Sequence, residues 1–227
     1  MSEGSFWCSF DECVSLLRTL RLFKEDNRHQ GWPYSDGCKE YSRSGEYKEI
    51  YQQMVDLRDY DLLLCDDSMF QLSISSGESR LLYIQNPLEH LTFENFLMSN
   101  GFNYTSETLL ELQGLFHEEY EQARSMMRVN SGATYMRYEV DSRGRQDNEN
   151  IHAFTHLHIG LNNNIRIPVG LHLTPFAFVI FVIRHVYYDE WAKAIRKGTV
   201  NLDYKKYCES LPENVWTESE RSQLFIS

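Results

Sequence analysis

The stretch FTHLHIGLNNNIRIPV, residues 154–169, alternates apolar and polar side chains on both sides of a run of three asparagines. Alternation with a period of two is typical of strands that bury one face. The stretch therefore predicts two strands, over residues 154–161 and 165–169, joined at the asparagines. A three-residue loop would place Leu161 opposite Ile165 and collect the apolar side chains on a single face. The other face then carries His156, His158 and Arg166.

A further strand is predicted over residues 134–140, where Met136, Tyr138 and Val140 form the apolar set. The two charged residues between them point to the opposite face of the strand. If this strand joins the same sheet, five side chains that commonly carry chemistry converge on one face: Arg137, Glu139, His156, His158 and Arg166.

These side chains suit the cleavage of phosphodiester bonds. Two imidazoles can divide the roles of general acid and general base, because the pKa of histidine lies near working pH. Arginines bind phosphate through paired hydrogen bonds and stabilise charge in the transition state. Two histidines and a carboxylate can instead hold a divalent metal ion that activates water. The candidate ligands of such a cofactor are His156, His158 and Glu139, with His152 as a further ligand or a proton shuttle.

A structural interpretation of the same residues stays open. His156 and His158 could form the outer face of a half-buried sheet and pair there with Glu139. Arg137 and Glu139 could be a surface ion pair, and such pairs contribute little to stability.

The rest of the chain predicts an α+β fold. Candidate strands at 61–65, 69–75 and 80–84 indicate a β-meander. Thr174 and Pro175 are typical of a helix start, and the helix expected from there to about residue 197 begins apolar nearly all round, which indicates burial. We expect a mostly antiparallel sheet with this buried apolar C-terminal helix on one face and further helices around it. Those helices are predicted over 6–25, 46–58, 92–98, 105–129 and 217–225.

Length and charge limit the possible functions. We expect a single domain over 1–227, with an acidic part to about 130, the strands of the site and the buried helix over 131–200, and a helical tail over 201–227. The net charge is −11, and residues 1–120 hold 21 acidic but only 9 basic side chains. Chains that bind nucleic acid alone are usually basic, so any such contact is expected to be local or supplied by a partner.

Cysteine usage and hydropathy indicate the compartment. The longest apolar run, residues 176–183, is much shorter than the roughly 20 residues of a membrane-spanning helix, so no membrane association is expected. The five cysteines include no Cys-x-x-Cys pair, which is typical of a protein kept in the reducing cytoplasm.

The motifs MRYEVD, HAFTHLHIG, NNNIRIPVG and LTPFAFVIFVIRHVYYDEW, spread over Tyr135–Trp191, resemble a bacterial family of unknown function. Members of that family sit beside a helicase in anti-phage defence islands. The His-x-His core also resembles the Tum-type bacterial toxins, which implies a small nuclease-like toxin restrained until infection. The family often carries His-Pro where this chain has His152–Ala153. Matching by motif, the resemblance places the site on Arg137, Tyr138, His156, His158 and Arg166.

Two functions follow as expectations. The first is a cytoplasmic anti-phage nuclease that acts with a helicase, which would recognise or deliver the nucleic acid. Tyr138 and Arg184 would then contact the substrate, beside the catalytic residues His156, His158, Arg166, Arg137 and Glu139. The alternative is a non-catalytic adaptor or acidic inhibitor that docks on the helicase through the acidic N-terminal region. A hydrolase of small nucleotides that depends on a metal ion is a third interpretation.

Overall fold

The computed structural model describes residues 1–28, 45–75, 78–88, 91–127, 132–141, 153–161, 165–200, 207–211, 216 and 218–221. The chain divides into two compact units. Unit 1 comprises Met1–Gln85 and Thr134–Ser227, and unit 2 comprises Asn86–Ala133. The single domain expected over residues 1–227 remains a prediction.

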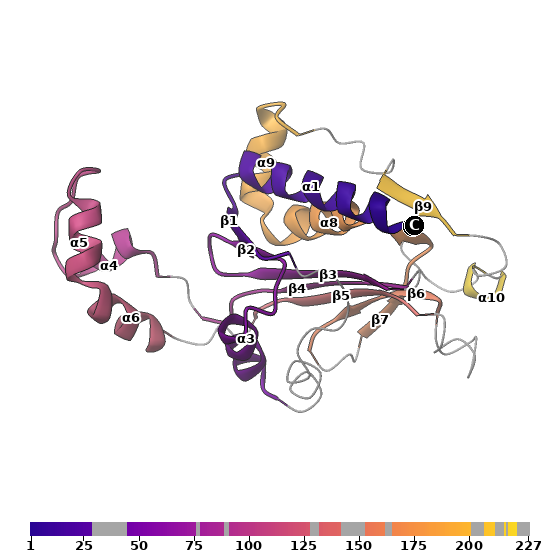
Figure 1. The fold of residues 1–227 in the computed structure, drawn as a ribbon, viewed down its shortest axis with the longest axis horizontal. Helices are drawn as coiled ribbons and strands as arrows, with labels where there is room; N and C mark the ends of the chain where they lie inside the picture. Colours follow the sequence, from indigo (N-terminus) through magenta and orange to yellow (C-terminus); the bar gives the residue numbers. More distant parts are fainter. Residues whose placement is uncertain are drawn as a thin grey trace. The chain divides into compact units, whose positions relative to one another are not determined.

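Within the described residues, unit 1 contains a seven-stranded antiparallel sheet in which each strand pairs with its neighbour in sequence (Figure 1). A separate pair of antiparallel strands joins β8 (Leu171–Leu173) to β9 (Cys208–Ser210). The α+β class with a mostly antiparallel sheet is therefore confirmed. The strands of the large sheet are β1 (Phe23–Asp26), β2 (Leu62–Leu64), β3 (Met69–Ser75), β4 (Glu78–Ile84), β5 (Tyr135–Val140), β6 (Thr155–Ile159) and β7 (Ile165–Pro168).

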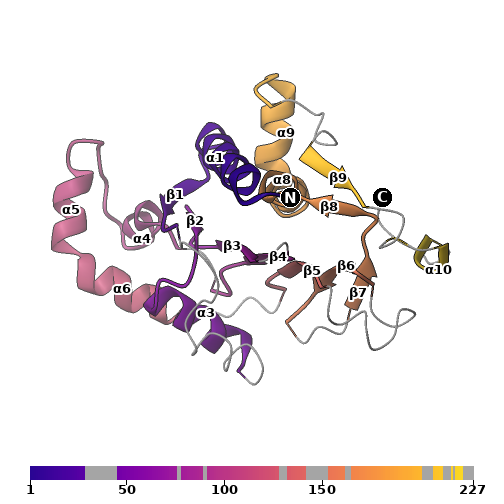
Figure 2. The ribbon, with the colours of Figure 1, turned by 45° about the vertical axis from the view of Figure 1, so that its right-hand side comes forward.

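Helices cover both faces of this sheet (Figure 2). On one face, α1 (Glu3–Thr19) and α8 (Pro175–Val186) share the main core with the strands, and the rings of Phe70 and Phe178 lie 6.3 Å apart between β3 and α8. On the other face, α3 (Tyr47–Asp56) packs its apolar side against β4 and β5. This second core contains Ile50, Tyr51, Met54, Leu82, Ile84 and Tyr135.

The start of α8 follows its sequence signals, but its end does not. Thr174 caps the helix by accepting a 3.2 Å hydrogen bond from the backbone N–H of Ala177. The single helix predicted to about residue 197 is wrong, because the chain breaks at Tyr187 before α9 (Tyr188–Arg196). The Tyr187 hydroxyl donates to Asp66 at 2.7 Å and lies 3.0 Å from the Tyr83 hydroxyl, so tertiary contacts hold the break.

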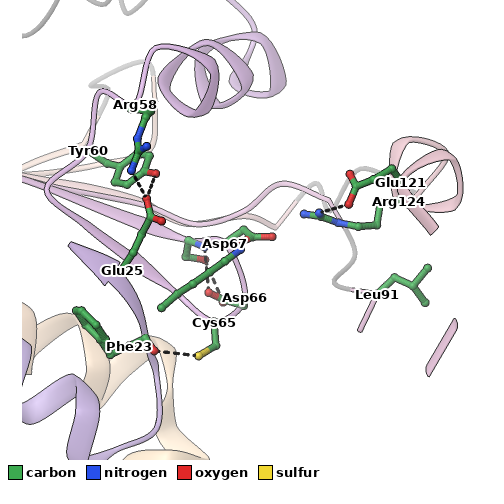
Figure 3. A network of polar contacts seen from close by, with 12 residues as sticks. Phe23, Glu25, Arg58, Tyr60, Cys65, Asp66, Asp67, Leu91, Glu121 and Arg124 are labelled. Atoms are coloured by element: carbon green, nitrogen blue, oxygen red, sulfur yellow. Dashed lines mark hydrogen bonds and ion pairs between the residues drawn. The ribbon is translucent and has the colours of Figure 1, made fainter. Parts of the chain in front are cut away.

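The helix predicted over residues 6–25 is also shorter than expected. The α1 helix ends at Thr19, and Arg21 adopts a left-handed backbone with φ 59°. The following residues form β1, an edge strand that side chains fasten to β2 and its surroundings (Figure 3). Glu25 accepts hydrogen bonds from Arg58, at 3.0 Å, and from Tyr60. The Cys65 thiol donates to the carbonyl of Phe23 at 3.4 Å.

Unit 2 is a small helical assembly with its own core. Its helices are α4 (Phe93–Ser99), α5 (Leu109–Leu115) and α6 (His117–Ser125). Phe93 and Phe96 pack against Tyr120, whose hydroxyl donates to the carbonyl of Leu91 at 2.7 Å. The single helix predicted over 105–129 is wrong here too, because Phe116 separates α5 from α6.

Two further features complete the fold. The short helix α10 (Glu218–Arg221) lies within the C-terminal helix predicted over 217–225. Among the described helices, none has both the length and the apolar character needed to cross a membrane.

Candidate functional site

The strands β4, β5 and β6 bring a polar cluster together on the sheet face that also packs against α3. Register is the cause: Glu139 lies opposite Arg80 on β4 and opposite His156 on β6. Arg137, two residues before Glu139, lies opposite His158. Because residues two apart on a strand share a face, all five side chains point to the same side of the sheet.

The strand β7 adds Arg166, one of the predicted site residues, to this face. The predicted pairing of Leu161 with Ile165 is wrong, since Ile159 lies opposite Ile165 and His158 lies opposite Arg166. The predicted register between β6 and β7 is wrong by two residues. A register shift of two residues leaves every side chain on the same face of the sheet. Arg166 therefore lies on the expected face, next to His158, and is exposed.

The Glu139 carboxylate lies at the centre of the cluster. Its Oε1 atom is 2.9 Å from Nε of Arg137 and 3.4 Å from Nε of Arg80. Its Oε2 atom is 3.3 Å from Nε2 of His158 and 3.6 Å from Nε2 of His156. Arg137 also donates from Nη2 to Oε2 at 3.3 Å, and from Nη1 to the Tyr135 hydroxyl at 3.3 Å. One carboxylate thus joins two guanidinium groups to two imidazoles.

The two imidazoles are buried and held at an angle to each other. His156 and His158 are 2% and 1% exposed, and their ring centres lie 4.6 Å apart with an angle of 75° between the planes. Nδ1 of His156 lies 3.0 Å from the carbonyl of Ala153, so its N–H donates there and its other nitrogen faces Glu139. Within the described part of the chain, Nδ1 of His158 has no hydrogen-bond partner.

Burial and charge set the protonation of the cluster. Burial alone would raise the pKa of the Glu139 carboxyl, but contacts with His156 and His158 and the charges of Arg137 and Arg80 hold its pKa well below its usual range. Burial lowers the pKa of His158, and the charge of Arg137 lowers it further, against the opposing effect of Glu139. At neutral pH the site therefore contains an ionised carboxylate beside a neutral His158.

Three of these residues could hold a metal ion. Glu139, His156 and His158 each offer one ligand atom, and the three atoms lie within 4.8 Å of one another. The predicted ligands from the sequence are thus brought together by the fold. His152, the further candidate, lies outside the described residues.

Two predicted substrate-binding residues do not join the cluster. Tyr138 points to the opposite face because it alternates with Arg137 and Glu139. It is fully buried in the main core, where its hydroxyl donates to the carbonyl of Leu171 at 3.0 Å and accepts from the N–H of Leu173 at 3.2 Å. Arg184 is exposed on α8, the helix that packs on that same opposite face.

Sequence reasoning missed Arg80, which contacts Glu139 from β4. A lone arginine in a meander strand carries no motif. The available signal was its position in an alternating strand, because Arg80 shares the parity of Leu82 and Ile84, which face α3.

This arrangement combines three chemical abilities. Arg80, Arg137 and Arg166 offer positive charge and donors on one sheet face, as phosphate binding requires. Buried imidazoles beside an ionised carboxylate can take or hold a proton, or bind a metal ion. A substrate would reach the cluster at Glu139 and Arg80, because their side chains are 22% and 25% exposed.

Comparisons with known proteins include a match to a protein family. A family model, described only as an uncharacterized conserved protein, matches residues 22–227. The matched range includes every strand of the large sheet and the whole polar cluster. Neither the curated proteins nor the solved structures include a significant match to this chain.

Proposed function

The chain belongs to the uncharacterized conserved protein family DUF2290, and we propose that it is a nuclease effector of anti-phage defence that acts in the cytoplasm with a helicase. The observation that supports cleavage is the position of Glu139, whose carboxylate contacts two arginines and two buried histidines, with Oε1 nearest the arginine Nε atoms and Oε2 nearest the imidazoles. Separate binding groups for a phosphate and for a water molecule are thereby held on one rigid sheet.

The arginines would bind the phosphate that is attacked. Arg166 is exposed and Arg80 is partly exposed, so both are accessible to a polyanion. Arg137 is only 9% exposed and is held by Glu139 and Tyr135. A fixed guanidinium group stabilises the charge that builds up on the phosphoryl oxygens without having to reorganise.

The histidines and Glu139 would activate the water. In hydrolysis the water oxygen forms a new bond to phosphorus, the ester P–O bond breaks, the water gives up a proton and the leaving oxygen gains one. Two imidazoles can support this step as base and acid, or as ligands of a metal ion that makes its bound water acidic. Both routes require His156 and His158 to keep their nitrogens directed at one point beside Glu139.

The helicase would bring the nucleic acid to the site. The chain has a net charge of −11, which repels a polyanion at long range. The positive charge of the site is local, on β4, β5 and β7. A partner that binds nucleic acid and places it at the arginines removes this obstacle.

The proposal is tested by phage challenge of cells that carry the chain and the helicase encoded beside it. The test variant is His156→Asn, whose amide keeps a donor near the Ala153 carbonyl but lacks Nε2. The control variant is His117→Asn, an exposed histidine of unit 2. We expect His156→Asn to abolish protection while the folded chain still co-purifies with the helicase, and His117→Asn to protect fully. Protection by His156→Asn, or loss of its helicase complex, would contradict a catalytic role.

A second function, a non-catalytic acidic adaptor, is favoured by a different observation. Unit 2 exposes the glutamates of α5, α6 and the preceding turn. The described residues of these two helices include a single arginine, Arg124, and no lysine. Such a surface could occupy a basic nucleic-acid channel of the helicase. Competition between the chain and DNA for the bare helicase, weakened by salt, would support the adaptor, and simultaneous binding of both would contradict it. The exposed glutamates are Glu107, Glu111, Glu118, Glu119 and Glu121.

A further inference from the structure

We propose that Glu139, His156 and His158 bind one divalent ion of a first-row transition metal such as Zn²⁺. The inference rests on the proposed function, because it uses the same site and assigns how that site activates water. It goes further by naming the ion class and the ligands.

The distances between the candidate ligand atoms fit a single ion. Oε2 of Glu139 lies 3.3 Å from Nε2 of His158 and 3.6 Å from Nε2 of His156. Two ligands bound at about 2.1 Å to a tetrahedral Zn²⁺ ion lie about 3.4 Å apart. Both imidazole nitrogens therefore already have the separation from the carboxylate oxygen that ligands of one ion require, and the ligand atoms of all three residues lie within 4.8 Å of one another.

The orientation of His156 supports the same assignment. Its Nδ1–H donates to the Ala153 carbonyl, so a neutral ring directs the lone pair of Nε2 toward the Glu139 carboxylate. With the proton on Nδ1, the Nε2 atom has a lone pair that a metal ion beside Glu139 could bind. Metal-bound histidines in general fix their second nitrogen on a carbonyl or carboxylate in this way.

The donor set selects the class of ion. Two imidazole nitrogens and one carboxylate oxygen suit Zn²⁺ and its first-row neighbours, whereas Mg²⁺ and Ca²⁺ prefer oxygen ligands alone. Three protein ligands also leave a coordination position for water, as in catalytic zinc sites. The side chain of Glu139, 22% exposed, marks the side from which that water and a substrate would approach.

The arginines oppose the ion by charge, and one of them also contacts its carboxylate ligand atom. Arg137 and Arg80 place their Nε atoms nearest Oε1, and the imidazoles face Oε2. Arg137 also donates from Nη2 to Oε2 at 3.3 Å, so an ion at Oε2 would replace this hydrogen bond while Oε1 keeps its contacts with the two Nε atoms. A phosphate bound by the arginines would offset their charge, so the substrate and the ion are expected to favour each other's binding.

The test measures metal binding by the tag-free full-length chain. The chain is stripped with EDTA, titrated with Zn²⁺ by calorimetry, and its metal content after gel filtration is measured by mass spectrometry. We expect one equivalent of Zn²⁺ that an excess of Mg²⁺ does not displace. Binding should weaken by more than about tenfold in His156→Asn, His158→Gln and Glu139→Gln, and should be unchanged in the control His117→Asn.

Two results would overturn the metal site: no stoichiometric Zn²⁺ on the wild-type chain, or unchanged affinity in all three variants. Should the variants fail to fold, the visible absorption of Co²⁺ bound to the wild-type chain decides, because tetrahedral Co²⁺ with nitrogen and oxygen ligands absorbs strongly and hydrated Co²⁺ does not. A chain that binds the ion but cleaves nothing overturns the nuclease and keeps the site. Cleavage by a metal-stripped chain in EDTA keeps the nuclease and overturns the catalytic metal.

Discussion

Nε2 of His158 lies 3.3 Å from Oε2 of Glu139, although the two residues belong to different strands and are not directly opposite each other. The contact runs diagonally across the pairing of β5 with β6, because Glu139 faces His156 and Arg137 faces His158. A carboxylate placed diagonally reaches both imidazoles at once. This position makes Glu139 the residue on which the cluster depends.

We expect Glu139→Gln to destabilise unit 1 by about 2 kcal/mol, because the amide leaves two guanidinium groups without their carboxylate partner. The free energy of unfolding, measured in urea, checks this. The matched control is Glu121→Gln, which removes a more exposed ion pair with Arg124 on α6 and should change stability by less than about 0.5 kcal/mol. Equal effects of the two substitutions would show that the cluster is not a coupled network.

We expect Tyr138→Phe to lower the stability of the chain without lowering its cleavage rate. Removal of the hydroxyl leaves the Leu171 carbonyl and the Leu173 N–H without their partner, at a cost of about 1 to 2 kcal/mol. Cleavage by the folded variant should equal that of the wild type, since Tyr138 lies on the far face of the sheet from Glu139. Loss of cleavage without loss of stability would place Tyr138 in the site after all.

The sequence was sufficient to predict which face of the sheet carries each predicted residue of the cluster. It was not sufficient to predict every residue of the cluster. Alternation has a period of two, so the assignment of His156, His158, Arg137 and Glu139 to one face survives even the register error of two residues. Arg80 could not be predicted, because only the pairing of β4 with β5 shows that it lies opposite Glu139. That pairing joins segments separated by the whole of unit 2.

The helices show where periodicity stops being informative. Thr174 and Pro175 located the start of α8, because these two residues act locally. The break at Tyr187 depends on hydroxyl contacts with Asp66 and Tyr83, which lie far away in the sequence. The first three residues of β1 were predicted as the end of a helix, since the four residues of this strand alternate too briefly to reveal a strand.

Phe178→Ala tests the packing of α8 on the sheet. Phe178 is fully buried and contacts Phe70 of β3, so its removal should cost about 3 to 5 kcal/mol through lost burial and the cavity left behind. The control is Ile165→Ala, an apolar residue of β7 that is 52% exposed and should cost less than about 1 kcal/mol. Thermal or urea unfolding measures both, and a small effect at Phe178 would mean that α8 does not pack as described.

Alkylation of cysteines tests the placement of α1. Cys13 is 0% exposed and burial raises the pKa of its thiol, whereas Cys8 on the same helix is exposed. We expect iodoacetamide at mildly alkaline pH to modify Cys8 in the folded chain and to reach Cys13 only after denaturation, because the thiolate is the reactive form. Peptide mass spectrometry distinguishes the two sites. Fast modification of Cys13 in the native chain would contradict its burial.

The central claim, that the cluster around Glu139 hydrolyses phosphodiester bonds, is tested most directly by cleavage of labelled RNA and DNA. The purified chain is assayed alone and with the proposed helicase partner, in Zn²⁺, Mn²⁺, Mg²⁺ or EDTA, beside His158→Gln, whose amide keeps a donor toward Glu139. The account predicts cleavage of at least one substrate by the wild type, and a rate lower by about a hundredfold or more in His158→Gln. Absence of cleavage in every reaction, or equal rates for the variant and the wild type, would contradict it.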